Sequence, residues 1–582
     1  MFGRQQKMWQ STRYSIKLCC MTSGTETLSF AGTGVVAGTA YAPVVWIRPR
    51  PAVPSAARTI AEDARPAEYE RFVQAADAVA DRLAHRAEAA SGPAAEVLRA
   101  TSGMVCDRGW RKAVRKNVRG GADAEYSTAQ ATEKFVNMFI AAGGLMAERT
   151  TDLKDIRDRV IAELRGEPEP GLPSIEGEAL LFADDLSPAD TAALDTAHFK
   201  GLVTELGGPT SHTAIIARQL NLPCIVAAGT EIHDVAAGTA VMIDGGIGTV
   251  TVNPDADEAR RQVAESVARA EKVAAWRGPA QTKDGHRVQL LANVQDGNAA
   301  RLAAQTQAEG IGLYRTEMSF LSATEEPSVD DQAALYRSVF TAFPSSKVVV
   351  RTLDAGSDKP IAFANMQAEE NPALGVRGLR IARQNQALLT RQLDAIAKAA
   401  EGRGTDAPTW VMAPMVATAK EAEWFADLCR ERGLTAGAMI EVPAAALMAD
   451  KIMPHLDFVS IGTNDLTQYT MAADRLSSQL AYLTDPWQPA VLRLIQHTCM
   501  VGRDTQTAVG VCGEAAADPL LACVLTGLGV DSLSAASTAI AGVGTRLSET
   551  TIEQCEKAAE AALDASGAVA AREAVRRMLV EN

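Results

Sequence analysis

The sequence predicts a multidomain α/β protein: a discontinuous α/β domain with an inserted all-α subdomain, followed by a C-terminal (β/α)8 TIM barrel. Three observations predict this architecture. Short strand-like runs alternate with helical stretches after residue 288, strand-like runs flank residues 66–165, and those flanked residues themselves have helical periodicity. At 582 residues, the chain is also too long for one compact domain.

The boundaries follow from proline-rich joints and from changes in periodicity. Basic residues occur before residue 27 without an apolar segment after them, which indicates an extension rather than a targeting signal. The expected parts are a disordered extension (1–27), a discontinuous α/β domain (28–65 and 166–253), a helical subdomain (66–165), a helical linker (254–280) and the barrel (281–575).

Composition excludes several classes of protein. The net charge of −14 is opposite to the basic surplus of most nucleic-acid-binding proteins. Nine cysteines are scattered without a CxxC pair, so neither a disulfide framework nor a zinc site is indicated, and a reducing, cytoplasmic location is expected. No segment approaches the ~20 consecutive apolar residues that a membrane span needs, so no membrane insertion is expected.

The stretch GGPTSHTAIIAR at residues 207–218 is the most informative part of the α/β domain. Its glycines and proline end an apolar run, Thr210 or Ser211 can cap a helix, and residues 214–220 have a helical pattern. His212 then lies in a first helical turn, where free backbone N–H groups and the helix dipole favour an anion. His212 is therefore a candidate nucleophile, and the alternative is a histidine with only a capping or core role.

This stretch, followed by LPCIV at residues 222–226, resembles the phosphohistidine signature shared by enzyme I of the bacterial sugar phosphotransferase system, pyruvate phosphate dikinase and phosphoenolpyruvate synthase. The resemblance implies that His212, like the matching histidine of those families, carries a phosphoryl group to or from phosphoenolpyruvate. The α/β domain is then a swivelling β/β/α phosphohistidine domain.

The predicted barrel has eight strand-like runs, the fourth of them weak: 289–294, 310–315, 347–351, 374–379, 410–415, 438–441, 458–462 and 508–512. Active sites of such barrels lie at the C-terminal ends of the strands. The side chains at or near those ends form a chemically coherent set: Arg315, Arg351, Arg377, Glu441, Asn464, Asp465, Arg475 and Cys512. Arginines suit the phosphate and carboxylate of phosphoenolpyruvate, and a hard cation would let the two carboxylates approach that anion.

The whole region 30–570 resembles enzyme I in the order of its motifs. The resemblance implies that Arg315, Arg351, Asn464, Asp465 and Arg475 bind substrate, and Arg377 belongs to the same strand-end set. It also implies that Glu441 and Asp465 bind Mg²⁺ and that Cys512 gives a proton to the enolpyruvate carbon. Residues 483–489 and 533–537 depart from the usual family pattern near the barrel mouth.

The sequence is therefore identified as a member of the phosphoenolpyruvate-protein phosphotransferase family. The resemblance implies autophosphorylation of His212, release of pyruvate and transfer to a histidine of the phosphocarrier protein HPr, the first step of sugar uptake by the phosphotransferase system. It implies HPr docking on residues 66–165, a homodimer formed through the barrel, and a hinged movement of the histidine domain. An ATP-dependent synthase or dikinase and a non-catalytic phosphoenolpyruvate sensor are the alternatives.

One feature of the helical subdomain has two interpretations. A basic run occupies residues 108–119 and surrounds Trp110. A solvated helix face is favoured over a patch that binds phosphate or nucleic acid.

Overall fold

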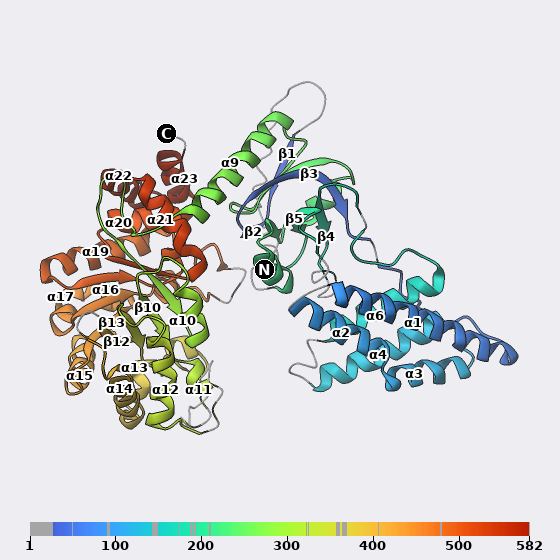
Figure 1. Cartoon of the computed structure of the whole chain (residues 1–582), viewed down its shortest axis with the longest axis horizontal. Coiled ribbons are helices and arrows are strands. Elements are labelled where there is room, and N and C mark those ends of the chain that lie inside the picture. Colours follow the sequence, from blue (N-terminus) through green and yellow to red (C-terminus); the bar gives the residue numbers. More distant parts are fainter. Residues whose placement is uncertain are drawn as a thin grey trace, which may run out of the picture. The chain divides into compact units, whose positions relative to one another are not determined.

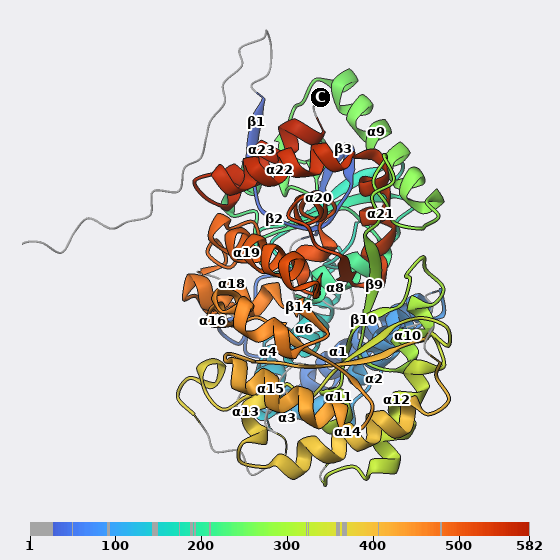
Figure 2. The ribbon, with the colours of Figure 1, turned by 90° about the vertical axis from the view of Figure 1, so that its left-hand side faces the viewer.

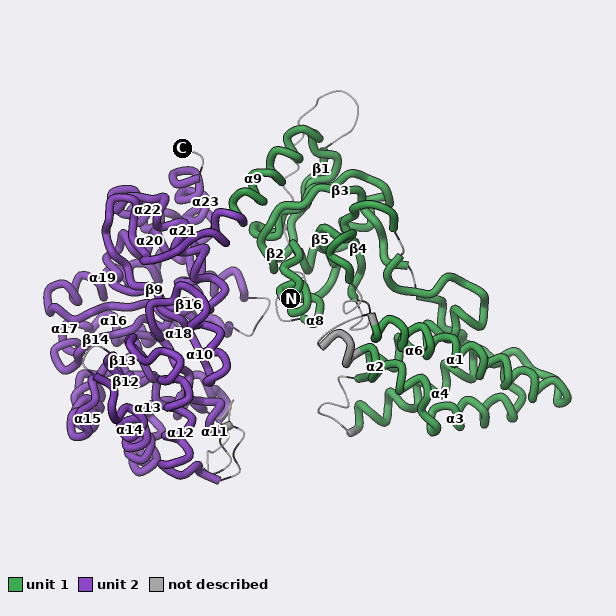
Figure 3. Tube along the Cα trace, in the orientation of Figure 1, with its two compact units in different colours: residues 1–270 green, residues 271–582 purple. Residues whose placement is uncertain are grey.

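The chain folds into two compact units, residues 1–270 and 271–582, drawn in separate colours in Figure 3. This computed structural model describes residues 27–48, 50–89, 93–142, 149–173, 175–186, 190, 194–208, 211–321, 323, 325–356, 361, 363, 369–404, 407–475, 477 and 480–580. The expected extension at 1–27 lies outside the described residues except for Thr27.

An eight-stranded sheet forms the first part of unit 1. Its strands are β1 (Leu28–Ala31), β2 (Thr33–Val36), β3 (Thr39–Trp46), β4 (Ala179–Ala183), β5 (Phe199–Thr204), β6 (Cys224–Val226), β7 (Ala240–Asp244) and β8 (Thr249–Val252). Their order is β1-β8-β7-β3-β4-β5-β6-β2, with β3 to β6 parallel and the remaining pairs antiparallel. Gly245 and Gly246 form the turn between β7 and β8, as the sequence predicts.

Between β3 and β4 the chain forms a helical insert, visible as the blue and cyan helices of Figure 1. The insert contains α1 (Arg65–Ala89), α2 (Pro93–Val105), α3 (Arg108–Arg119), α4 (Ala124–Ala142) and α6 (Thr150–Arg165). Phe72 and Leu83 of α1 pack in one core with Trp110 and Val114 of α3.

The basic run lies on α3. Trp110, Val114 and Val118 follow one face of this helix and are buried, whereas Arg108, Lys112, Arg115, Lys116 and Arg119 are exposed. Asp107 caps the helix by accepting the N–H of Trp110 at 2.7 Å. Trp110 is thus a core residue, and the basic side chains form a solvated helix face.

A buried ion-pair cluster joins α6 to the chain that leads into β5. The guanidinium of Arg159 is fully buried and contacts Asp155 at 2.7 Å, Asp190 at 2.8 Å and Glu169 at 2.5 Å. Although burial opposes its charge, these carboxylates raise the pKa of Arg159, so it remains a cation.

The linker expected at 254–280 contains α9 (Ala256–Ala275). This helix begins beside Asp255, whose Oδ1 accepts the N–H groups of Asp257 at 3.1 Å and Glu258 at 2.9 Å. The division between the two compact units falls within it, after residue 270.

Arg159→Met is expected to lower stability by about 3–5 kcal/mol, because Asp155 and Asp190 lose a buried cationic partner. The measurement is scanning calorimetry of the full chain, in which the transition of unit 1 should move to lower temperature. Arg260→Met on α9 is the control: Arg260 and its partner Asp257 are both exposed, so its effect should stay below about 1 kcal/mol. Equal melting of the two variants would contradict the expectation.

Unit 2 is a closed barrel of eight parallel strands, which confirms the predicted fold class. The strands are β9 (Gln289–Val294), β10 (Ile311–Arg315), β11 (Val348–Arg351), β12 (Thr409–Ala413), β13 (Thr435–Ile440), β14 (Phe458–Ile461), β15 (Ala508–Val511) and β16 (Ser532–Ala535). The barrel closes where β16 pairs with β9.

Helices surround these strands, as Figure 2 shows for unit 2. They are α10 (Gly297–Ala303), α11 (Met318–Leu321), α12 (Val329–Phe340), α13 (Leu379–Ala382), α14 (Gln386–Ala400), α15 (Ala419–Arg430), α16 (Pro443–Leu447), α17 (Ala449–Ile452), α18 (Thr463–Met471), α19 (Pro489–Thr505), α20 (Pro519–Gly527), α21 (Ile540–Glu549), α22 (Ile552–Asp564) and α23 (Ala568–Leu579). None of the helices in the described part of the chain has both the length and the hydrophobicity of a transmembrane helix.

One predicted strand is wrong. Residues 374–379 form no strand: a 3-10 helix covers Pro372–Leu374 and α13 begins at Leu379. Gly378 has φ of +57°, which interrupts an extended path there. The eighth strand is β16, so residues 508–512 belong to the seventh strand of the barrel and not to the last.

Candidate active site

His212 is the first residue of α8 (His212–Leu220), as the sequence predicts. Ser211 is the N-cap, and its Oγ accepts the N–H of Ala214 at 3.2 Å. Gly207 has φ of +97°, which lets the chain turn sharply after β5. Pro209 and Thr210 of the motif lie outside the described residues. The first turn of α8 therefore places His212 where backbone N–H groups and the helix dipole favour a negative charge.

The C-terminal ends of the barrel strands bring together most of the predicted charged residues. An ion-pair chain of alternating sign runs Glu317, Arg351, Asp354, Arg377, Asp465, Arg475. Its closest contacts are 2.8 Å from Glu317 to Arg351, 3.2 Å from Arg351 to Asp354 and 3.0 Å from Asp354 to Arg377. Asp465, in the first turn of α18, then contacts Arg377 at 3.3 Å and Arg475 at 3.6 Å.

This chain of ion pairs is buried except at Arg475, which forms one end. Arg351, Asp354, Arg377 and Asp465 are each 6–8% exposed, whereas Arg475 is exposed. Burial opposes the charge of Arg351, but Glu317 and Asp354 raise its pKa, and Asp354 and Asp465 do the same for the pKa of Arg377. Both guanidinium groups therefore stay charged and fixed in place.

Arg315 ends β10, and its Cα is paired with that of Arg351 on β11. It is exposed, and no ion pair links it to any residue that the structure describes. Its guanidinium is thus available to an anion at the barrel mouth.

Glu441 follows β13 and is fully buried. Its Oε1 accepts the N–H of Met415 at 2.7 Å, while its Oε2 has no hydrogen-bond partner among the described residues. Burial, reinforced by the negative charges of Asp354 and Asp465, raises the pKa of Glu441 to about 8. A buried carboxylate oxygen without a partner, beside a second carboxylate, fits a hard cation that takes oxygen ligands.

The backbone around Glu441 is shaped for this contact. Met415 has φ of +60°, an uncommon value for a residue with a side chain, and it is this residue whose N–H reaches Glu441. Gly462 follows β14, and a Cβ at this position would lie 2.8 Å from Oε2 of Glu441. Glycine thus lets the end of β14 approach the carboxylate.

Cys512 follows β15 and is 2% exposed. Its Sγ lies 3.6 Å from the carbonyl oxygen of Ile461, and burial raises the pKa of its thiol. It is therefore a protonated thiol at neutral pH. Glu514 lies two residues beyond Cys512, and its N–H donates to Oδ1 of Asn464, which lies in the first turn of α18, at 2.9 Å.

Three residues of the site had no predicted role: Glu317, Asp354 and Met415. Glu317 and Asp354 lie two and three residues beyond the arginines that end β10 and β11, and this proximity was the available signal. Met415 acts through its backbone N–H, for which its side-chain identity gives no signal.

Three family models match the chain. A PEP-utilising enzyme, N-terminal model covers residues 31–149, a PEP-utilising enzyme, mobile domain model covers 175–248, and a PEP-utilising enzyme, PEP-binding domain model covers 269–552.

Among similar proteins, a phosphoenolpyruvate-protein phosphotransferase of Streptomyces coelicolor is 45% identical, over 94% of this chain and 98% of its own. One from Haloferax volcanii is 38% identical over 92% of this chain and 97% of its own. A solution structure of enzyme I (nEIt) is 26% identical, covers 41% of this chain and 99% of its own, and has a TM-score of 0.38. The chain belongs to the phosphoenolpyruvate-protein phosphotransferase family and is a transferase.

Proposed function

We propose that His212 takes the phosphoryl group of phosphoenolpyruvate and passes it to a histidine of the phosphocarrier protein HPr, as the first step of the sugar phosphotransferase system. The observation that carries this proposal is the barrel mouth, where Asp354 fixes the guanidinium groups of Arg351 and Arg377 and where Glu441 has an unpartnered carboxylate oxygen. This arrangement suits a small, highly charged phosphate ester.

In the proposed reaction, a ring nitrogen of His212 attacks phosphorus and the bond from phosphorus to the enol oxygen breaks. Arg315, Arg351, Arg377, Asn464, Asp465 and Arg475 are the proposed substrate-binding residues. The buried thiol of Cys512 gives its proton to the methylene carbon, so that pyruvate leaves. The site's charges position the substrate, which is the main requirement of phosphoryl transfer.

Glu441 and Asp465 are the proposed ligands of Mg²⁺. When bound, this cation supplies charge neutralisation between the two carboxylates and the substrate's oxygens. The unpartnered oxygen of Glu441 supports this assignment.

We also propose functions for the expected parts of the chain. The helical subdomain, 66–165, docks HPr, the domain formed by 28–65 and 166–253 carries the phosphoryl group, and the barrel, 281–575, binds phosphoenolpyruvate and forms a homodimer. His212 belongs to unit 1 and the barrel arginines to unit 2. Phosphorylation therefore requires the units to bring these groups together, with the linker at 254–280 as the hinge.

The experiment that tests the function is transfer of radiolabel from phosphoenolpyruvate, through this chain, to purified HPr. We expect HPr to be labelled only when the chain, Mg²⁺ and the acceptor histidine are all present. Label that stops on the chain would contradict the proposed acceptor. Label that requires ATP would instead favour the synthase or dikinase alternative.

Mg²⁺ affinity is expected to rise about tenfold per pH unit below pH 8 and then to level off, because the cation must displace the proton that Glu441 holds. The stability of the metal-free protein changes with pH in the opposite direction to the Mg²⁺ affinity. The unfolded chain loses this proton near pH 4.5 and the folded chain near pH 8, so the metal-free protein loses stability as pH rises through that window.

Calorimetric titration of Mg²⁺ in buffers of different ionisation enthalpy measures this proton. At neutral pH, the apparent binding enthalpy should vary with the buffer, with a slope of about one proton released. An enthalpy that does not depend on the buffer would show that Glu441 is already ionised before the cation binds.

A further inference from the structure

A cavity of about 460 Å³ lies at the N-terminal ends of the barrel strands. It is lined by residues near the starts of β9, β12, β14, β15 and β16 and by the C-terminal part of α19. Arg351 and Glu441 lie at the other ends of the strands, so this cavity and the candidate active site occupy opposite ends of the barrel. The proposed phosphoryl transfer makes no use of it.

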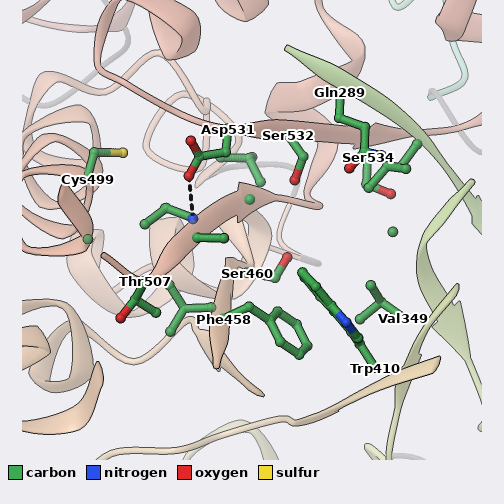
Figure 4. A pocket seen from close by; sticks show the side chains of 18 of the residues that line it. Gln289, Val349, Trp410, Phe458, Ser460, Cys499, Thr507, Asp531, Ser532 and Ser534 are labelled. Carbon is green, nitrogen blue, oxygen red and sulfur yellow. Dashed lines mark hydrogen bonds between the residues drawn. The ribbon is translucent and has the colours of Figure 1, made fainter. Parts of the chain in front are cut away.

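The cavity is open because small residues line part of the barrel interior. Ser460, Ser532 and Ser534, visible in Figure 4, stand where such barrels usually have bulky branched side chains. Gly312 and Gly510 have no side chain, so two of these hydroxyls can lie close to the backbone of neighbouring strands. A Cβ added at Gly312 would lie 2.5 Å from Ser534 Oγ, and one added at Gly510 would lie 2.6 Å from Ser532 Oγ. The interior thus offers hydroxyl groups around space that no side chain fills.

An aromatic wall forms another side of the cavity. The rings of Trp410 and Phe458 have centroids 4.6 Å apart and planes inclined by 30°. Figure 4 shows both side chains at the cavity, together with Val349. This wall presents a flat apolar surface to anything that enters.

Two cations line the cavity without an ion-pair partner among the described residues. The Nζ of Lys347 lies 4.4 Å from the centroid of the Trp410 ring and is half-buried, and Arg503 on α19 is exposed at the mouth. Burial lowers the pKa of Lys347 to about 8, while the charges of Asp531 and Glu309 oppose this effect.

Both carboxylates that face Lys347 are already engaged. Asp531 accepts the N–H of Val509 at 2.8 Å, and Glu309 pairs with Arg287 at 2.6 Å and accepts the N–H of Leu290 at 3.2 Å. The lining side chains Lys347, Arg503 and Asp531 therefore leave a positive surplus, in a chain whose net charge is −14.

We propose that this cavity binds a small organic acid, whose carboxylate pairs with Lys347 and Arg503 and whose flat body lies against Trp410 and Phe458. The Ser532 hydroxyl offers a further hydrogen bond to a polar substituent on that body, whereas the Ser534 hydroxyl already donates to Asn293 Oδ1 at 2.6 Å. A bound carboxylate would give Lys347 the partner that its half-buried ammonium lacks.

The test uses the full-length protein with Mg²⁺, benzoate as the probe and benzamide as its neutral isostere, in saturation-transfer NMR titrations. Benzoate is expected to bind saturably, and benzamide at least about tenfold more weakly, because only the carboxylate pairs with the cations. Lys347→Met and Arg503→Gln should each weaken benzoate about tenfold or more. Lys420→Met, which removes an exposed lysine of α15, should have no effect.

Two further measurements separate a binding role from a structural one. Phosphoenolpyruvate-dependent labelling of Lys347→Met should remain normal, because Lys347 lies at the end of the barrel opposite the candidate active site. Benzoate affinity in the unaltered protein should fall as pH rises through about 8, where Lys347 loses its proton, and this fall should be absent in Lys347→Met.

Three results would overturn the proposal. They are equal binding of benzoate and benzamide, unchanged benzoate binding in both Lys347→Met and Arg503→Gln, and inorganic phosphate binding as tightly as benzoate. The last would show a general anion site rather than one for organic acids. The exposed Arg503 variant keeps the test decisive if Lys347→Met disturbs folding.

Discussion

Replacement of His212 by alanine is expected to reduce the acid-labile phosphate that the chain acquires from phosphoenolpyruvate and Mg²⁺ to background. The reason is that the proposed reaction forms a covalent bond to the imidazole, and alanine offers no nucleophile at the first position of α8. The measurement is incorporation of radiolabel, followed by acid treatment, which releases phosphate from histidine but not from serine or threonine.

His198→Ala is the matched control. His198 is an exposed histidine of the same unit, bonded through Nδ1 to Asp195 at 2.7 Å, and its loss should leave labelling unchanged. His212→Ala should still bind phosphoenolpyruvate in calorimetry, because the barrel residues are untouched. Full labelling of His212→Ala would assign the phosphoryl group to another residue, and binding without labelling of the unaltered protein would favour the sensor alternative.

Glu441→Gln is expected to slow phosphorylation of His212 by about 10²–10³-fold or more. Glutamine has the same shape and can keep the contact with the N–H of Met415, but its amide replaces the unpartnered carboxylate oxygen proposed to hold Mg²⁺. Asp465→Asn should be comparably slow and should also raise the KM for phosphoenolpyruvate, because it weakens the contacts that hold Arg377 and Arg475. Single-turnover kinetics at varied substrate and Mg²⁺ concentrations measure both effects.

Glu556→Gln, an exposed change on α22, is the control for the loss of one negative charge. The two site variants should keep the circular dichroism and melting behaviour of a folded barrel. If both phosphorylate His212 at the full rate, the metal site has been assigned to the wrong carboxylates.

A strand of the barrel could be predicted from the sequence only where its own residues have a high β propensity. Val348–Arg351 is a run of valines, so its β propensity is plain in the sequence. Ser532–Ala535 has no β-branched residue, and its extended form depends on pairing with β15 and β9, which contacts far along the chain provide. Conversely, the apolar residues at 374–379 suggested a strand, but the backbone at Gly378 does not continue one.

The candidate site likewise contains some residues whose place could be predicted from the sequence and others whose place could not. Arg315, Arg351 and Glu441 could be predicted because parallel strands all end at one mouth, so strand-end residues meet whatever the details of packing. The bridging role of Asp354 could not, because it depends on the distances to Arg351 and Arg377 in the folded barrel. The partnerless oxygen of Glu441 is likewise a property of its three-dimensional surroundings.

The ion-pair chain of the barrel mouth has a consequence for how fast the site can work. In water, solvent dipoles must turn whenever charge shifts along a reacting molecule, and that turning forms much of the barrier. Here, Asp354 holds Arg351 and Arg377 in position before any substrate arrives, so the reorganisation has already been made during folding. Asp354, which has no proposed contact with substrate, is therefore a residue through which the reorganisation energy of the reaction can be changed without removing a group that binds substrate.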